Sequence, residues 1–278
     1  MISIEGLNKP YLIAEAGVSH FGSFQEAKKL LSAAIKAKCN AFKIQVFDVD
    51  KLFANNAEGW KDRLKKRVLN IDEISKLSEI CDNNNIDFII TPHDDSIFPF
   101  IEKIKLNAIK IGSGEVGNLD FISKCFDLTD FLIFSTGLST IEDIDKIVDL
   151  AKLKAKKLAI LHCNTSYPTV DNDVNLSVLN QFIKRYPDHV IGYSDHTEDH
   201  LACQGAVFLG AKIIERHITL RKNIPNAQDW KVSSLPDELI DLRSLLDRSY
   251  LQLGSQNKFI TESAMKNIYW ACKSPYLK

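Results

Sequence analysis

The chain alternates short β-rich runs with segments whose apolar residues have helical spacing, and this alternation most constrains its fold. The first β-rich run is YLIAEAG at 11–17, and a helical face follows it at Ala27, Leu30, Leu31 and Ala34. The remaining β-rich runs lie at 41–47, 87–92, 108–113, 131–137, 157–163, 190–196 and 211–219. Eight strand–helix units in 278 residues match the size of a (β/α)8 barrel.

A doubly wound sheet also alternates strands and helices, but no G-x-G-x-x-G follows the first strand. We therefore predict an α/β fold, a single-domain (β/α)8 TIM barrel over 1–248. Residues 249–278 are predicted as a short C-terminal tail. Residues 48–70, rich in Asp, Asn and Lys, are predicted as a second loop long enough to cover a barrel mouth.

Composition excludes several classes of protein. Thirty-five Lys and Arg against 36 Asp and Glu give a net charge of −1, whereas nucleic-acid binding usually needs a basic excess. The N-terminus lacks the form of a signal peptide, and no run approaches the roughly 20 apolar residues that span a bilayer. The cysteines are scattered without a C-x-x-C pair, which predicts reduced thiols in a cytoplasmic protein. They are Cys39, Cys81, Cys125, Cys163, Cys203 and Cys272.

Polar residues gather at the ends of the predicted strands, where barrel enzymes carry their active sites. In strand order they are Glu15 and His20; Lys43 and Gln45; Thr91 and His93; Lys110, Ser113 and Glu115; Ser135; His162, Thr165 and Tyr167; Ser194 and His196; Glu215 and His217. Each has an ordinary structural explanation by itself, such as a strand lysine paired with a core carboxylate. Because buried charges are costly unless paired or used, their recurrence at nearly every strand end predicts a catalytic mouth.

Two kinds of site follow from these residues. Lys43 and Lys110, with nearby hydroxyl groups and glycine turns, form a plausible cradle for a small phosphorylated, carboxylated ligand. His196 and His217 end adjacent strands, about 4.8 Å apart in a sheet, and can share a divalent metal that keeps water ligands. Mn²⁺ suits two protein ligands better than structural zinc does.

The chain resembles the N-acetylneuraminate (sialic acid) synthase family, which includes legionaminate and pseudaminate synthases. The matching segments, in family order from about residue 10 to 272, are IAEAGVSHFGSFQEAKKLLSAA, FKIQVF, ITPHD, IKIGSGEVGNL, STGLST, LHCNTSYPT, GYSDHT and GAKIIERHITL. The resemblance implies a transferase that condenses phosphoenolpyruvate with an N-acylated amino-sugar aldehyde of the N-acetylmannosamine type. Its products would be a sialic-acid-like 3-deoxy-nonulosonic acid and phosphate.

The resemblance also implies a role for each matching residue. Phosphoenolpyruvate contacts are implied for Lys43, Thr91, Lys110, Ser113, Ser135, Thr165 and Ser194. Sugar contacts are implied for Glu15, Gln45, Tyr167 and Asp229. The implied metal ligands are His196 and His217, for Mn²⁺ with Mg²⁺ or Co²⁺ as alternatives. The catalytic set is Glu15, Glu115, Lys110 and His217.

The sequence departs from the family pattern mainly on the sugar side. The first loop reads Ser19-His20-Phe21-Gly22 in place of asparagine-histidine-asparagine-glycine, and Thr165 replaces an asparagine. The loop Asn226-Ala227-Gln228-Asp229-Trp230 keeps the family aspartate but lacks its histidine. Family members also continue into an antifreeze-like domain that reaches across a homodimer. Here the sequence ends at 274–278, so we expect that domain to be absent, to be supplied by a separate protein, or to have been cut from this chain.

Two alternatives stay open. One is a phosphoenolpyruvate-dependent synthase with another acceptor, of the octulosonate or heptulosonate type. The other is a non-catalytic paralogue that binds a phosphorylated ligand or serves as an assembly subunit, although a binding module has no need of the two metal-binding histidines. The sequence does not identify the acceptor sugar.

Overall fold

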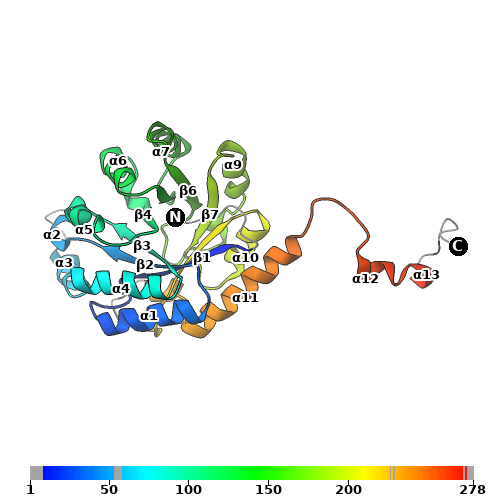
Figure 1. Cartoon of the computed structure of the whole chain (residues 1–278), viewed down its shortest axis with the longest axis horizontal. Helices are drawn as coiled ribbons and strands as arrows, with labels where there is room; N and C mark the ends of the chain where they lie inside the picture. Colours follow the sequence, from blue (N-terminus) through cyan, green and yellow to red (C-terminus); the bar gives the residue numbers. More distant parts are fainter. Residues whose placement is uncertain (1–8, 53–57, 226, 228, 272, 274–278) are drawn as a thin grey trace.

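The computed structural model describes residues 9–52, 58–225, 227, 229–271 and 273, and its strands close into a parallel barrel in sequence order, β1 to β8 (Figure 1). The strands are β1 (Tyr11–Gly17), β2 (Ala41–Val46), β3 (Asp87–Pro92), β4 (Ala108–Ile111), β5 (Phe131–Ser135), β6 (Lys157–His162), β7 (Val190–Asp195) and β8 (Ile213–His217). The barrel closes through β1 and β8, where Glu15 stands opposite His217. The predicted fold class is confirmed.

Helices surround the strands as an outer ring (Figure 1). They are α1 (Phe24–Lys36), α2 (Val49–Leu52), α3 (Glu58–Lys65), α4 (Ile71–Asn83), α5 (Phe98–Ile101), α6 (Leu119–Leu128), α7 (Ile141–Leu153), α8 (Asp171–Val174), α9 (Val178–Arg185), α10 (Leu201–Phe208) and α11 (Pro236–Leu253). Local signals start several of them. Ser23 caps α1, and Asn70 with Glu73 and Thr140 with Asp143 form capping boxes on α4 and α7.

Strand alternation divides the core into two layers. Side chains such as Leu12, Phe42 and Phe134 point outward and pack against the helices. Side chains such as Ile13 and Ile213 point inward and fill the barrel towards the N-terminal ends of the strands. Glu15 lies two residues after Ile13 on β1, and Glu215 lies two residues after Ile213 on β8, so both share the inward face. The barrel interior therefore changes from apolar to polar along the strands.

Two predicted segments differ in detail from the structure. The stretch 48–70 contains the short helices α2 and α3 around the undescribed residues 53–57, so its described part is not an irregular loop. The last barrel helix, α11, continues to Leu253, past the boundary placed after residue 248. Beyond it, α12 (Glu262–Met265) and α13 (Ile268–Ala271) stand away from the barrel on an extended segment (Figure 1).

Some predictions fall on residues outside the described ranges: Cys272, Asn226, Gln228 and 274–278. The five described cysteines are free and buried. No helix in the described ranges is both long and apolar enough to span a bilayer.

Candidate active site

The C-terminal ends of the strands surround a cavity of about 170 Å³. Most of the predicted site residues line it: Glu15, Lys43, Gln45, Thr91, Lys110, Ser113, Ser135, Thr165, Tyr167, Ser194, His196 and His217. They come from β1 to β8 and the loops that follow them, so the barrel brings together residues up to 202 positions apart, from Glu15 to His217. Glu115 and Asp229 do not line this cavity.

Two buried lysines and two buried carboxyl groups form the floor of the cavity. Lys43 Nζ lies 3.0 Å from Glu15 Oε2 and 3.6 Å from Glu215 Oε2, and it donates to Thr91 Oγ1 at 3.0 Å. Lys110 Nζ donates to Ser135 Oγ and to the Ile111 carbonyl, and lies 4.0 Å from Glu215 Oε1. All four charged residues are at most 4% exposed. Such a group of charges is costly to bury unless it is paired or used by a ligand.

The two carboxyl groups titrate very differently. Burial raises the pKa of Glu15 to about 7, against the opposing effect of Lys43. Burial also acts to raise the pKa of Glu215, but Lys110 and Lys43 reverse this and bring it to about 2. Near neutral pH, Glu215 is therefore a fixed negative charge, whereas Glu15 exchanges a proton.

Hydroxyl groups and a backbone N–H complete the cationic side of the cavity. Ser113 Oγ accepts from Gly137 N at 2.9 Å and lies 3.2 Å from Cys163 Sγ. A Cβ at Gly137 would stand 2.9 Å from Ser113 Oγ, Cys163 Sγ and Thr165 Cγ2, so only glycine lets the backbone approach this wall. The wall thus offers hydroxyl donors beside two ammonium groups, which suits a phosphate or carboxylate ligand.

His196 and His217 lie where β7 and β8 end, with ring centroids 5.3 Å apart. Tyr167 stacks on His196 at a centroid distance of 4.1 Å. Burial lowers the pKa of both imidazoles, and His196 lowers that of His217 further. His196 Nδ1 is bonded to the Asn164 carbonyl, which leaves Nε2 with the lone pair.

These two imidazoles fit a divalent metal. His217 Nδ1 is buried and has no hydrogen-bond partner in the part of the chain that the structure describes. Both rings are neutral, as metal ligands must be, and the carbonyl that fixes His196 is the usual outer partner of a ligating histidine. The described residues form no cluster of three or more His, Cys, Asp or Glu ligands. A metal held here keeps open positions for substrate or water.

The predicted sugar-side residues divide between two places. Gln45 Nε2 donates to Glu15 Oε1 at 3.2 Å inside the main cavity. Asp229 instead lines a small neighbouring cavity with Phe21, Arg67 and Trp230. Burial raises the pKa of Asp229, and the charge of Arg67 opposes this. The charge of Asp229 also acts to raise the pKa of Tyr167, which lines the main cavity.

Glu115 is the predicted catalytic residue that stands apart from the cavity. It ends the 3-10 turn η2 (Ser113–Glu115), and its carboxylate accepts from Asn118 Nδ2 at 2.8 Å. The cavity has instead a carboxylate with no role in the predicted set, Glu215, together with His93 and Cys163. Glu215 precedes His217 by two residues on the same strand, and this spacing in the sequence predicts that both side chains lie on the inner face.

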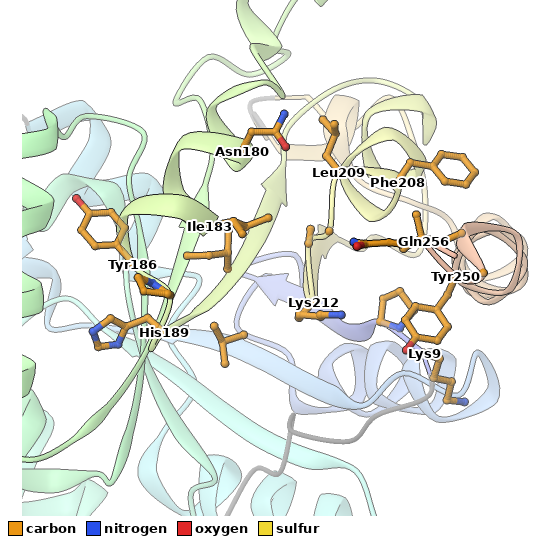
Figure 2. A pocket seen from close by; sticks show the side chains of 18 of the residues that line it. Lys9, Asn180, Ile183, Tyr186, His189, Phe208, Leu209, Lys212, Tyr250 and Gln256 are labelled. Atoms are coloured by element: carbon orange, nitrogen blue, oxygen red, sulfur yellow. The ribbon is translucent and has the colours of Figure 1, made fainter. Parts of the chain in front are cut away.

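A second, larger cavity of about 850 Å³ lies at the other end of the barrel (Figure 2). Ile183, Phe208 and Leu253 give it an apolar wall, and Lys9 and Lys212 also line it. None of the predicted site residues lines it. Because barrel enzymes carry catalysis at the C-terminal ends of their strands, the smaller polar cavity is the candidate active site.

The model of the NeuB family matches residues 30–258. N-acetylneuraminate-9-phosphate synthase of Drosophila melanogaster is 32% identical over 252 residues, which cover 86% of this chain and 68% of that protein. N,N'-diacetyllegionaminic acid synthase of Campylobacter jejuni is 32% identical, over 96% of this chain and 84% of that protein.

A solved structure is similar over nearly the whole chain. It is that of the N-acetylneuraminic acid (sialic acid) synthetase of Leptospira borgpetersenii in complex with citrate. The two chains superpose with a TM-score of 0.89 at 30% identity, over 97% of this chain and 95% of the other.

Proposed function

The chain belongs to the NeuB family, and we propose that it condenses phosphoenolpyruvate with the open-chain aldehyde of an N-acylated amino sugar. The products are a 3-deoxy-nonulosonic acid and inorganic phosphate. It is a carbon–carbon bond-forming synthase of the sialic acid type. The observation that carries the proposal is the meeting of two buried ammonium groups and two neutral imidazoles in one cavity.

The cationic wall supports binding of phosphoenolpyruvate. Lys43 and Lys110 supply two positive charges, and the hydroxyl groups of Thr91, Ser113 and Ser135 lie beside them. Ser194 is held by Glu215, to whose Oε1 its Oγ donates at 2.9 Å. Holding the two substrates in register at such a site lowers the barrier by as much as about 7–11 kcal/mol.

Glu15 is suited to the proton transfer. C3 of phosphoenolpyruvate attacks the aldehyde carbon, whose oxygen takes up a proton to become a hydroxyl group, and water captures the positive charge that develops at C2. That water loses one proton as the new C–O bond forms. The resulting C2 hydroxyl loses its remaining proton as the C–O bond to phosphate breaks, which leaves the C2 ketone and inorganic phosphate. At neutral pH, a carboxylate with a pKa of about 7 is well matched to receive the proton from the attacking water.

A divalent ion at His196 and His217 is part of the proposal, with Mn²⁺ preferred and Mg²⁺ or Co²⁺ as alternatives. The neutral rings and the unpartnered His217 Nδ1 support it. When bound, such an ion polarises the aldehyde as a Lewis acid.

The partners of the chain are proposed at two levels. The small-molecule partners are phosphoenolpyruvate and an amino sugar of the N-acetylmannosamine type. We further propose a homodimer, and a separate antifreeze-like domain protein that completes the sugar side. The cytoplasmic location stays a prediction from the sequence, which does not identify the acceptor sugar.

The test is phosphate release from phosphoenolpyruvate with Mn²⁺ across a panel of acceptors. The panel holds N-acetylmannosamine, its 6-phosphate, diacetamido sugars, and pentose and tetrose phosphates. We expect release that depends on one N-acylated amino sugar and that stops when a chelator is added. Lys110→Ala and His217→Ala are expected to abolish turnover.

The controls separate the alternatives. Release with a pentose or tetrose phosphate alone contradicts the amino-sugar acceptor and favours an octulosonate- or heptulosonate-type synthase. Phosphoenolpyruvate binding without release at any acceptor, even after an antifreeze-like domain is added in trans, identifies a non-catalytic paralogue. Near-native activity in Lys110→Ala contradicts the role assigned to that lysine.

A further inference from the structure

Asp195 and Arg216 form a buried ion pair just behind the two histidines of the site. Asp195 is the last residue of β7, directly before His196, and Arg216 precedes His217 on β8; Asp195 and Arg216 stand opposite each other in the strand register. Because side chains alternate along a strand, this pair points away from the cavity when the histidines point into it. The two side chains are 0% and 1% exposed.

Arg216 holds the chain on both sides of His196. Its NH1 group donates to the Asp195 carboxylate, one residue before His196. The same group donates to the Thr197 carbonyl, one residue after His196, at 2.8 Å. The other guanidinium nitrogens donate to the Glu198 carbonyl at 3.2 Å and to Ser234 Oγ at 3.1 Å. One rigid fork therefore fixes the loop after β7 against β8.

Asp195 is equally well satisfied. Its Oδ1 accepts from the Tyr193 hydroxyl at 3.1 Å and from the backbone N–H and hydroxyl of Thr197 at 3.1 and 2.9 Å. Its Oδ2 accepts from Cys203 Sγ at 3.2 Å, which anchors it to α10. The carboxylate thus has partners on β7, on the following loop and on the covering helix, besides the arginine on β8.

The Asp195–Arg216 pair lies at the point where the backbone pairing between β7 and β8 ends. The register of β7 and β8 ends at Asp195 and Arg216, so no further strand pair ties His196 to His217. His217 is placed by β1, opposite Glu15, and by Ser234 N, which donates to its carbonyl at 2.8 Å. His196 is bonded to Asn164 and Thr169 on the loop after β6. The side-chain fork is the link between these two separately held residues.

We propose that Asp195 and Arg216 are positioning residues that fix the spacing of the two imidazoles and so determine the affinity for the divalent ion. A buried ion pair is weak evidence for stability, since apolar residues often replace one without loss. Arg216, however, binds the residues directly before and after His196, and packing alone does not require such contacts. The inference rests on the proposed metal at His196 and His217.

The experiment measures metal affinity separately from catalysis. The metal-free protein is titrated with Mn²⁺, free Mn²⁺ is followed by electron paramagnetic resonance, and thermal unfolding is recorded in chelator. The double variant Asp195→Asn/Arg216→Gln removes both charges together and keeps polar groups of similar size. We expect its Mn²⁺ affinity to fall about ten- to hundredfold, as for other groups that orient metal ligands.

A second variant and a matched control make the result decisive. Arg216→Lys keeps the cation beside Asp195 but cannot reach all four acceptors, so we expect an intermediate affinity even if the double variant does not fold. The control is Asp247→Asn/Arg243→Gln, which alters an ion pair between two residues of α11. Arg243 also donates to the Pro10 carbonyl, at the other end of the barrel from the two histidines. The control should change the unfolding temperature without changing the Mn²⁺ affinity.

Three outcomes are informative. Weaker Mn²⁺ binding in the Asp195 and Arg216 variants, with phosphoenolpyruvate affinity retained, supports the proposal. Unchanged Mn²⁺ affinity in folded variants, with stability lost as in the control, overturns it and leaves the proposed function intact. An unaltered chain that binds neither Mn²⁺ nor Co²⁺ contradicts the metal assignment itself, and this inference fails with it.

Discussion

Glu15 and Glu215 share Lys43 as a neighbour, yet their pKa values are shifted in opposite directions. Lys43 lies within 3.6 Å of both carboxyl groups, whereas Lys110 approaches Glu215. Ser194 also donates to Glu215, which further stabilises its charged form. Two carboxyl groups held close together push their pKa values apart, so that one stays charged and the other is free to exchange a proton.

This asymmetry predicts the pH dependence of the reaction. A base with a pKa of about 7 is active when deprotonated, so we expect turnover to rise with pH, to reach half of its plateau at about 7, and to level off above that. Glu15→Gln should lower turnover by roughly 10²- to 10⁴-fold and remove that rise. The measurement is the rate of phosphate release between acidic and mildly alkaline pH.

Glu115→Gln is the informative comparison. Because the Glu115 carboxylate is held by Asn118 and does not line the cavity, we expect a smaller loss than in Glu15→Gln. A Glu15→Gln enzyme that kept the same rise with pH would assign the titration to another group.

At the residue scale, the sequence predicts positions better than roles. Alternation along β8 places Glu215 on the same face as His217, but only the distances to Lys43 and Lys110 reveal that it balances both lysines. Glu115 shows the opposite case. It directly follows Ser113 and Gly114 in the sequence, and the turn η2 directs its carboxylate to Asn118 instead of the cavity.

At the scale of elements, the loop after β1 depends on a close backbone contact. Gly22 has a φ of +72°, and a Cβ there would stand 2.3 Å from the Lys66 carbonyl oxygen. Gly22→Ala should therefore destabilise the protein by about 1–3 kcal/mol, because it adds both strain and a clash. Chemical denaturation measures the change.

Gly114→Ala is the matched control for that substitution. A Cβ at Gly114 meets no atom within 4 Å, and its φ lies outside the left-handed region. The control should leave the free energy of unfolding nearly unchanged. Equal effects of the two substitutions would show that the contact between Gly22 and Lys66 does not hold the loop.

The strands could be predicted because their signal is local. Each β-rich run of the sequence begins within two residues of an observed strand, since buried parallel strands need continuous apolar residues. Short helices carry no such periodicity, so α2, α3 and α8 are not apparent in the sequence. Whether Asp229 shares a cavity with Glu15 depends on how two loops pack, which no local pattern encodes.

At the scale of the whole molecule, the segment after α11 is built differently from the barrel. Tyr269 and Trp270 are 90% and 76% exposed, and Phe259, Ile260 and Met265 are also exposed. Together with α12 and α13, they stand clear of the barrel (Figure 1). Neighbouring large apolar side chains left in water mark a surface that another molecule covers. This arrangement supports the proposed homodimer.

The dimer can be tested through these two aromatic residues. We expect the unaltered chain to have twice the 31.4 kDa mass of the monomer by light scattering, and Tyr269→Ser/Trp270→Ser to shift it towards the monomer. Leu153→Ser is the control, because Leu153 is 83% exposed on α7 and belongs to the barrel. A monomeric unaltered chain contradicts the dimer. A dimer that persists in the double variant places the interface on the barrel instead of the segment after α11.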